Sequence, residues 1–570
     1  MAETKIEFAN APMPLGQKIL LQMKTMEDIR RDYEIGLWED ISRFVNPRRE
    51  NIRSGSEYNL KGQRRGKDAY DGTPNSALGV WRDGMQGFLV SESLNWFRSE
   101  MDNPYLNDND NVRTFLQDYD LGMYSAYRRG NYYAVQSEWF GDAGSIGTAT
   151  LYTEEDIKEG KSVHTVVHPR EVFIAENKYG EVDTEYRKFM MTARQMVQKF
   201  TYEKLSAKAK NDARNNPHEE SELIHAVFPN DEMVFGKMTN RGKPTRSVYI
   251  ELKLSGLEGI GHLLRDSGYR IDPYAVWRFR KNSDEIYGYS PAADAIIEIF
   301  GLQQFGKTMM EAAQKSVDPS LNIPEEQRGQ VRITPHGYNY YQDPKRVITP
   351  ILTGINYPIG VEQQNRLRDL LEDKYRVNYF QMLTRMSAGK QRKTAEEIIA
   401  MKSEVAVLLG PQVDRLYNEG IKKHFDIVSD IEDRAGRLPN PDDYNLPDEF
   451  YEGGRININL TGPLAQAQRR LFRMQPIQNT LNELAPAAAV LGPEIMDVVN
   501  KDELSEMIVE AGAFPQKAIN SREERKRIRE QRAADAAAAQ QKQDLLEAAK
   551  VAPNLGKSVE KDSILEKVGV

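Results

Sequence analysis

The hydrophobic pattern of this 570-residue chain changes character twice, and these changes constrain the fold most. Residues 14–46, 73–90 and 110–138 space their apolar side chains by three and four, which predicts helices. Residues 145–260 hold β-branched, alternating segments such as RSVYIELKL, broken by Gly, Pro and Asn, which predicts antiparallel sheet. From Ser290 the helical spacing returns. We therefore expect an α+β fold that is mainly helical.

The second half of the chain encloses a small β module between two amphipathic helices. The expected order is helix 289–318, short strands and turns 319–360, helix 361–384, a polar loop, a helix from Thr394 to about 428, strand 455–460 and helical segments 463–512. A capping box, T-A-E-E, opens the helix at Thr394. From Ser521 the chain is charged and Ala-rich with little apolar stripe, which is typical of a surface helix in an oligomer or of a partly ordered tail.

Composition excludes several classes of chemistry. The chain contains no cysteine, so disulfides, thiolate metal sites and cysteine nucleophiles are ruled out. The first residues lack the apolar core of a signal peptide, and the longest apolar run, at 405–410, is too short to span a bilayer. We expect a protein made in the cytoplasm with no membrane partner. Its net charge of −8 argues against nucleic acid covering the whole surface, but it permits a local cationic site.

Residues 301–308, GLQQFGKT, fit the P-loop expression G-x-x-x-x-G-K-[ST]. As a nucleotide hydrolase, the chain would place Lys307 on the β- and γ-phosphates and Thr308 on magnesium. Two observations argue against this. The apolar helical spacing continues through the motif, and no later run of four apolar residues ends in Asp. We therefore favour a helix in which Gly301 and Gly306, each costing about 1 kcal/mol relative to Ala, allow close packing.

Other searches for catalytic and metal motifs predict no active site, no metal and no cofactor. His164 and His168 lie in a predicted strand without further ligands nearby, and no HExxH occurs. The acidic run at 107–111 lacks the Gly and Glu of a calcium loop. The chain also lacks a G-x-S-x-G nucleophile elbow.

Two polar loops concentrate positive charge. The stretch 385–393 holds Arg385, Lys390, Arg392 and Lys393 and no acid. A solvated turn is the ordinary fate of such a run, and sequence-independent contact with DNA phosphates is the alternative. For the basic stretch at 47–68 we favour a solvated loop.

Seven stretches in a shared order resemble the head-to-tail connector, or portal, proteins of short-tailed bacteriophages. They are WEDISRFVNPRREN (38–51), AYDGTPNSAL (69–78), LNWF (94–97), GSIGTATLY (144–152), YGYSPAADA (287–295), KTAEEI (393–398) and LTGPLAQAQR (460–469). The chain departs from the family's pattern in lacking a proline before LNWF and in carrying Glu396 where Thr is common.

The resemblance implies a ring subunit, usually one of twelve, at one capsid vertex. A separate terminase motor would pump genome DNA through the channel, and the tail would attach afterwards. The implied regions are the wing (1–288 and 395–462), the stem helices (289–318 and 361–384), the clip (319–360), the tunnel loop (385–394), the crown (463–518) and a C-terminal barrel helix or tail (519–570).

The resemblance also implies roles for three sets of residues. The four cations of the tunnel loop would contact double-stranded DNA in the channel, and Gly301 and Gly306 would pack stem helices of neighbouring subunits. Contacts to the terminase large subunit, and later to tail adaptor and tail tube proteins, would come from Arg328, Arg332, Tyr338, Tyr340, Tyr341, Lys345 and Arg346. The clip tyrosines are equally consistent with a small core of their own.

Further implied partners are the major capsid and scaffolding proteins, and the expected location is the virion. Two alternatives stay open: a nucleotide hydrolase based on residues 301–308, and an assembly scaffold that makes no DNA contact.

Overall fold

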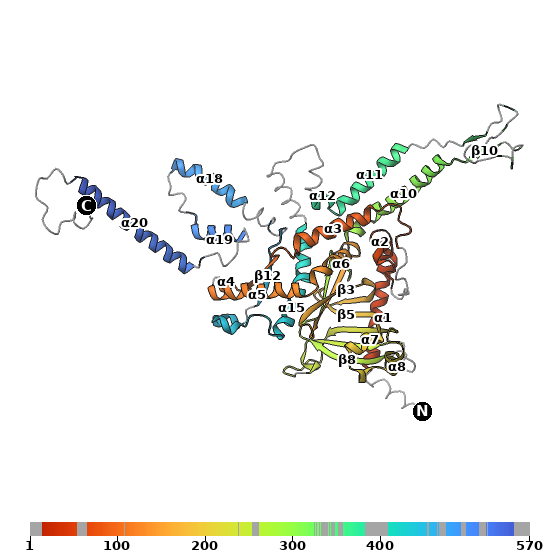
Figure 1. The fold of residues 1–570 in the computed structure, drawn as a ribbon, viewed down its shortest axis with the longest axis horizontal. Coiled ribbons are helices and arrows are strands. Elements are labelled where there is room, and N and C mark those ends of the chain that lie inside the picture. Colours follow the sequence, from red (N-terminus) through yellow and green to blue (C-terminus); the bar gives the residue numbers. More distant parts are fainter. Residues whose placement is uncertain are drawn as a thin grey trace, which may run out of the picture. The chain divides into compact units, whose positions relative to one another are not determined.

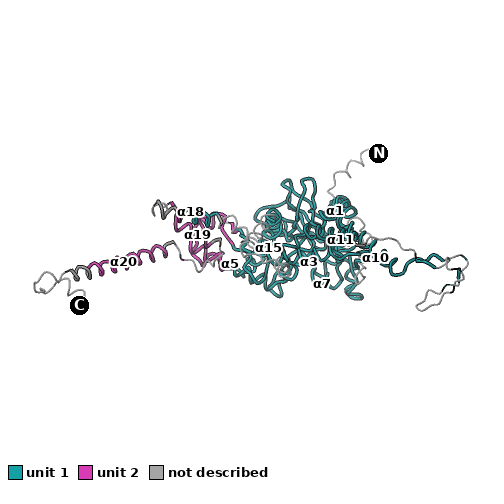
Figure 2. The backbone as a smooth tube through the Cα atoms, turned by 90° about the horizontal axis from the view of Figure 1, so that it is seen from above, with its two compact units in different colours: residues 1–98, 119–439, 457–483 teal, residues 99–118, 440–456, 484–570 magenta. Residues whose placement is uncertain are grey.

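The computed structural model describes most of the chain in two compact units. The described residues are 14–53, 65–107, 109–237, 239–252, 261–323, 357–381, 409–452, 455–463, 475–491, 498–511 and 522–551, with isolated positions at 325–350, 466 and 520. Unit 1 comprises residues 1–98, 119–439 and 457–483, and unit 2 comprises 99–118, 440–456 and 484–570 (Figure 2).

The larger antiparallel sheets of unit 1 have three and five strands (Figure 1). The smaller has the strand order β3–β2–β9 and the larger β4–β5–β6–β7–β8. Their bounds are β2 (Thr148–Asp156), β3 (Lys161–Val167), β9 (Tyr274–Arg278), β4 (Val172–Glu176), β5 (Val182–Thr192), β6 (Glu220–Pro229), β7 (Thr245–Glu251) and β8 (His262–Tyr269). The antiparallel sheet predicted for 145–260 is therefore present, and it continues beyond that range to β9.

Helices cover both faces of the larger sheet because its strands alternate apolar side chains between the two faces. Ile19 and Met23 of α1 cluster with Ile224 of β6 on one face. The next residue along β6, Leu223, lies on the other face with Met196 of α7. The helices involved are α1 (Leu15–Tyr33), α7 (Ala193–Lys199) and α8 (Ala207–Asn215).

The remainder of unit 1 is mainly helical. Its helices include α2 (Glu39–Phe44), α3 (Thr73–Leu89), α5 (Asp110–Arg129, which begins in unit 2), α6 (Tyr132–Ser145), α9 (Pro291–Asp294), α10 (Ile296–Val317), α11 (Tyr357–Lys374), α12 (Val377–Phe380) and α15 (Lys423–Arg434). Two π-helical segments interrupt this pattern, η2 (Glu34–Trp38) and η8 (Leu416–Lys422). Short 3₁₀ turns lie at Pro47–Arg49, Pro169–Glu171, Tyr202–Lys204 and Asn240–Gly242.

α10 and α11 are the two long helices predicted on either side of the β module, and they run antiparallel. Gly301 near the start of α10 faces Leu367 late in α11, and Met309 later in α10 faces Gly360 early in α11 (Figure 1). Between them, β10 (Leu321–Asn322) and β11 (Thr349–Pro350) pair antiparallel. The predicted order of helix, β pairing and helix is confirmed for these described residues.

Unit 2 is smaller and mostly helical. It contains α4 (Pro104–Asn107), the 3₁₀ turn Pro441–Tyr444, α16 (Asp448–Tyr451), α19 (Lys501–Ala511), α20 (Arg522–Val551) and the part of α18 (Gln475–Leu491) from Leu484 onward. Phe115 packs edge-on against Tyr444 and Phe450, with ring centroids 5.4 Å apart in both pairs. β1 (Phe97–Met101) and β12 (Ile456–Leu460) form a two-stranded sheet.

The charged, Ala-rich segment predicted from Ser521 forms α20, a helix of 30 residues. Its contacts with other copies of the chain stay a prediction. No helix among the described residues is both long and apolar enough to cross a membrane.

Candidate functional site

The P-loop-like motif lies inside a continuous helix. α10 runs from Ile296 to Val317 without a break at residues 301–308. A P-loop binds phosphates because its backbone N–H groups point out of a loop, whereas a helix interior uses those groups in its own hydrogen bonds. The Lys307 and Thr308 side chains are exposed on this helix. The geometry therefore argues against the nucleotide-hydrolase alternative.

Both glycines of the motif have close neighbours within unit 1. A Cβ atom added at Gly301 would lie 3.4 Å from Leu367 of α11, and one added at Gly306 would lie 3.2 Å from the Cβ of Tyr70. The second distance is tighter than ordinary van der Waals contact, so Tyr70 would have to move. These contacts explain the glycines within one chain, and their predicted role in packing neighbouring subunits stays a prediction.

Gln303, one turn before Gly306, binds the main chain of the same segment. Its Oε1 accepts hydrogen bonds from the backbone N–H groups of Tyr70 (2.7 Å) and Asp71 (3.0 Å). Its Nε2 donates to the carbonyl oxygen of Asp71 at 2.9 Å. The Gln303 side chain is buried, so all three bonds are shielded from water.

The Asp71 carboxylate joins this segment to α11. Oδ1 accepts from the backbone N–H (2.9 Å) and the hydroxyl (2.6 Å) of Thr73. Oδ2 accepts from Nε2 of Gln364 (3.1 Å) and from Nε (3.0 Å) and Nη2 (2.7 Å) of Arg368. Burial acts to raise the pKa of Asp71, but the bonds from Thr73 and Arg368 outweigh it, so the pKa is lowered below its ordinary value.

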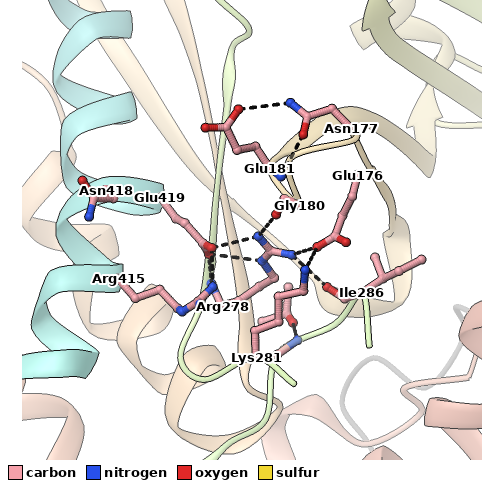
Figure 3. Close-up of polar contacts among 12 residues, drawn as sticks. Glu176, Asn177, Gly180, Glu181, Arg278, Lys281, Ile286, Arg415, Asn418 and Glu419 are labelled. Carbon is pink, nitrogen blue, oxygen red and sulfur yellow. Dashed lines mark hydrogen bonds and ion pairs between the residues drawn. The ribbon is translucent and has the colours of Figure 1, made fainter. Parts of the chain in front are cut away.

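A second polar cluster surrounds Arg278, which is 1% exposed at the end of β9 (Figure 3). Its backbone N–H and two guanidinium nitrogens donate to Glu419 of η8 at 2.8–3.2 Å. The guanidinium also bonds to Glu176 and to the carbonyl oxygens of Gly180 (2.9 Å) and Ile286 (3.2 Å). The buried guanidinium of Arg278, at the end of β9, therefore bonds to the β4–β5 turn, to η8 and to the segment that precedes α9.

η8 and the start of α15 bring two charged side chains, four residues apart, to different partners. Glu419 reaches Arg278, while Lys423, at the start of α15, reaches Asp272 at 2.5 Å and Glu185 at 3.4 Å. Gly420 allows this approach, because a Cβ there would lie 2.7 Å from the ring of Trp139. Burial opposes the positive charge of Lys423, but the two carboxylates outweigh it, and its pKa is raised.

Most of the site residues predicted from sequence fall outside the described residues. These are Arg385, Lys390, Arg392 and Lys393 of the tunnel loop, and Arg332, Tyr338, Tyr341, Lys345 and Arg346 of the clip. Arg328 is exposed, and Tyr340 is 88% exposed. The roles predicted for Arg328 and Tyr340 stay predictions. No group of three or more His, Asp and Glu side chains among the described residues could hold a metal ion.

Sequence reasoning missed the clusters centred on Asp71 and Arg278. A local signal for the first exists in the stretch D-G-T-P, where an Asp two residues before Thr is typical of a turn that opens a helix. The partners of Asp71 on α10 and α11 lie more than 230 residues away along the chain and leave no local signal.

Residues 16–519 match the family of bacteriophage head to tail connecting proteins, and the chain belongs to that family. It is 28% identical over 536 residues to the portal protein of Salmonella phage epsilon15, with 92% of each chain covered. It is 26% identical over 545 residues to the probable portal protein of Bordetella phage BPP-1, with 95% of each chain covered.

The resemblance inferred from the seven sequence stretches is therefore confirmed. Membership identifies a head-tail connector, or portal, protein of phages, from a family that is structural rather than enzymatic. It also implies a homo-oligomeric ring that associates with capsid and tail.

Proposed function

We propose that this protein forms the portal ring at one vertex of a phage capsid. The ring would be the channel through which terminase packages genome DNA, the exit for DNA ejection and the attachment site of the tail. The observation that carries this proposal is the family match over residues 16–519, together with two portal relatives covered over more than 90% of their length. The antiparallel pair α10 and α11, with a small β pairing between them, supports the assignment of these helices to the stem.

Ring formation is the first consequence to test. Electron microscopy of the purified protein, with its mass in solution, should show closed rings of about twelve subunits with an open centre, in line with closed cyclic symmetry. A chain that stays monomeric under all assembly conditions would contradict the proposal.

The basic tunnel loop is proposed to contact DNA. Repeated around a ring, Arg385, Lys390, Arg392 and Lys393 would form a belt of cations inside a protein of net charge −8. Such a belt binds phosphates without sequence preference, and its affinity falls as salt rises. The K390A/R392A/K393A variant should assemble rings but package or retain less DNA than the parent.

A matched control removes three exposed lysines of unit 1, in the variant K158A/K204A/K208A. Parent-like packaging and retention in the loop variant would refute the DNA contact and favour an assembly scaffold. Loss of DNA retention with intact rings would exclude that scaffold. ATP hydrolysis by the purified ring would instead revive the interpretation of residues 301–308 as a P-loop.

The clip is proposed to bind the terminase large subunit during packaging and the tail adaptor afterwards. Arg328 is exposed, and Arg346 belongs to the same predicted cationic and aromatic surface. Charge reversal at both positions (R328E/R346E) should weaken terminase binding, while K158E/K208E should not. Unchanged binding in the first variant would contradict the interface.

A further inference from the structure

The segment Arg65–Thr73 links the basic stretch at 47–68 to α3, and both stem helices hold it. From α10, the buried Gln303 side chain makes three hydrogen bonds to the main chain of Tyr70 and Asp71. From α11, Gln364 and Arg368 donate three hydrogen bonds to Oδ2 of Asp71. The segment is therefore bound at one point by side chains of two helices that are distant in sequence.

α10 and α11 move together because their contact is close. A Cβ at Gly360 would lie 2.5 Å from the sulfur of Met309, and one at Gly301 would contact Leu367. Glycines on both helices thus let the two backbones approach. A constraint on either helix consequently acts on the pair.

Two further hydrogen bonds join residues that flank the α10–α11 pair to the end of α6. The Ser290 hydroxyl, just before α9, donates to the carbonyl oxygen of Ser145 at 2.6 Å. The Tyr375 hydroxyl, just after α11, donates to the carbonyl oxygen of Gly144 at 3.1 Å. Because these acceptors are consecutive residues, the two bonds define a pivot and do not by themselves fix an angle. Apolar packing also holds the pair on unit 1, since the Phe300 ring of α10 lies edge-on to Phe44 of α2 with centroids 5.9 Å apart, and Leu371 of α11 is fully buried. The polar contacts of Asp71 add to this packing.

The Asp71 contacts lie away from that pivot. Gln303 is seven residues into α10, and Arg368 is seven residues before Tyr375. At 1.5 Å of rise per residue, each contact lies about 10 Å along its helix from the pivot end. A contact at that distance opposes rotation about the pivot.

We infer that Asp71 is a positioning residue that fixes the orientation of the α10–α11 pair on the body of unit 1. α12 follows α11 along the chain and precedes the stretch predicted to form the tunnel loop, so we expect a change in the orientation of the pair to affect that loop. The link to the loop rests on the proposed function, whereas the orientation of the helices does not. The Arg368 side chain is 40% exposed, so water reaches the Arg368 side of its ion pair with Asp71. We therefore expect this ion pair to break before the buried hydrogen bonds of Gln303.

The absence of native cysteine makes the orientation directly measurable. Spin labels at V317C near the end of α10 and at I157C in the β2–β3 turn occupy side chains that are 87% and 84% exposed. Doubly labelled chains, diluted into unlabelled chains, should give one narrow distance distribution by pulsed electron paramagnetic resonance. The D71A and Q303A variants should broaden or shift it.

Asp68→Ala provides the matched control. Asp68 lies in the same segment and pairs with Arg43, but the pair is about half exposed on both sides and touches neither stem helix. D68A should keep the parent distribution. If D71A fails to fold, as shown by its tryptophan fluorescence, R368A replaces it because the Arg368 side chain is partly exposed.

A D71A distribution as narrow as the parent's, at the same distance, overturns the inference, whether or not rings form. If the D71A distance distribution is broadened but the D71A rings retain DNA like the parent, the proposed effect of Asp71 on the tunnel loop is wrong. A broadened distribution combined with reduced DNA retention supports both parts. If the K390A/R392A/K393A variant retains DNA normally, the proposed function of the loop fails while the spin-label result still tests Asp71.

Discussion

Acidification to pH 5 should weaken unit 1 through two histidines that touch in its core. Nδ1 of His164 and Nε2 of His424 are 3.1 Å apart, and each residue is 1% exposed. His424 also stacks on Tyr132, with ring centroids 4.6 Å apart. Burial lowers the pKa of His164 to about 3 and holds the pKa of His424 well below its ordinary value. The His164 imidazole therefore stays neutral in the folded chain at pH 5, and burial disfavours the charged form of His424 in the same core.

The size of the effect follows from proton linkage. In the unfolded chain each histidine titrates near pH 6.5, so below that pH the unfolded state binds more protons than the folded state. Stability is therefore complete above about pH 6.5 and falls as the pH drops towards the folded pKa. At pH 5 a histidine that stays neutral costs about 2 kcal/mol, from about 1.4 kcal/mol per pH unit over 1.5 units.

The assay compares His424→Phe, which keeps an aromatic ring against Tyr132 but cannot be protonated, with the parent. Urea unfolding of unassembled chains can be followed by tryptophan fluorescence, because all five tryptophans are buried in unit 1. Between pH 7.5 and pH 5 the parent should lose more stability than H424F, by up to about 2 kcal/mol. The exposed His218 supplies a control, since H218Q should keep the parent's pH dependence. Equal losses in H424F and the parent would refute the reasoning.

Three further substitutions have defined outcomes. E419Q should destabilise unit 1 in the same urea assay, because it replaces one of the two carboxylates that pair with the buried Arg278. The loss should be smaller than the roughly 3–5 kcal/mol of a buried charge left without a partner, because Glu176 remains, and an unchanged urea midpoint would contradict this. G144A should lower the urea midpoint, because its Cβ would lie 2.5 Å from an indole ring of α3, while G79A, with no atom within 4 Å, should raise stability by up to about 1 kcal/mol. K307A should leave DNA packaging unchanged, and a packaging defect with intact rings would argue for a nucleotide site.

Periodicity in the sequence was sufficient to predict the secondary-structure classes. Apolar steps of three and four identified α1, α3, α10 and α11, and β-branched alternation over 145–260 identified the sheet region but not β8 and β9, which lie beyond it. These signals are local, because each helix or strand must bury its own apolar face. The two π-helical segments were not predicted, since a single extra residue in a turn barely disturbs such a pattern.

The polar clusters could not be predicted, because each is assembled from segments far apart in the chain. Arg278 gains its carboxylates from Glu176 and Glu419, and nothing in the residues around any of them specifies the other two. Buried charges of this kind need partners, but the sequence does not say which ones. The tunnel-loop prediction came from local charge together with the family resemblance, and both are independent of tertiary contacts.

Residues 301–308 of α10 match the P-loop expression, but their glycines serve a different physical purpose from those of a P-loop. In a P-loop, glycines permit a loop whose N–H groups surround phosphate. In α10, Gly301 and Gly306 leave room for Leu367 and Tyr70, and Gln303 between them binds the backbone of the incoming segment. A motif specifies residue types but not backbone conformation, so the apolar spacing through the motif was the more informative signal. That spacing predicted a helix, and a helix is what presents Gln303 and Gly306, three residues apart, on one face.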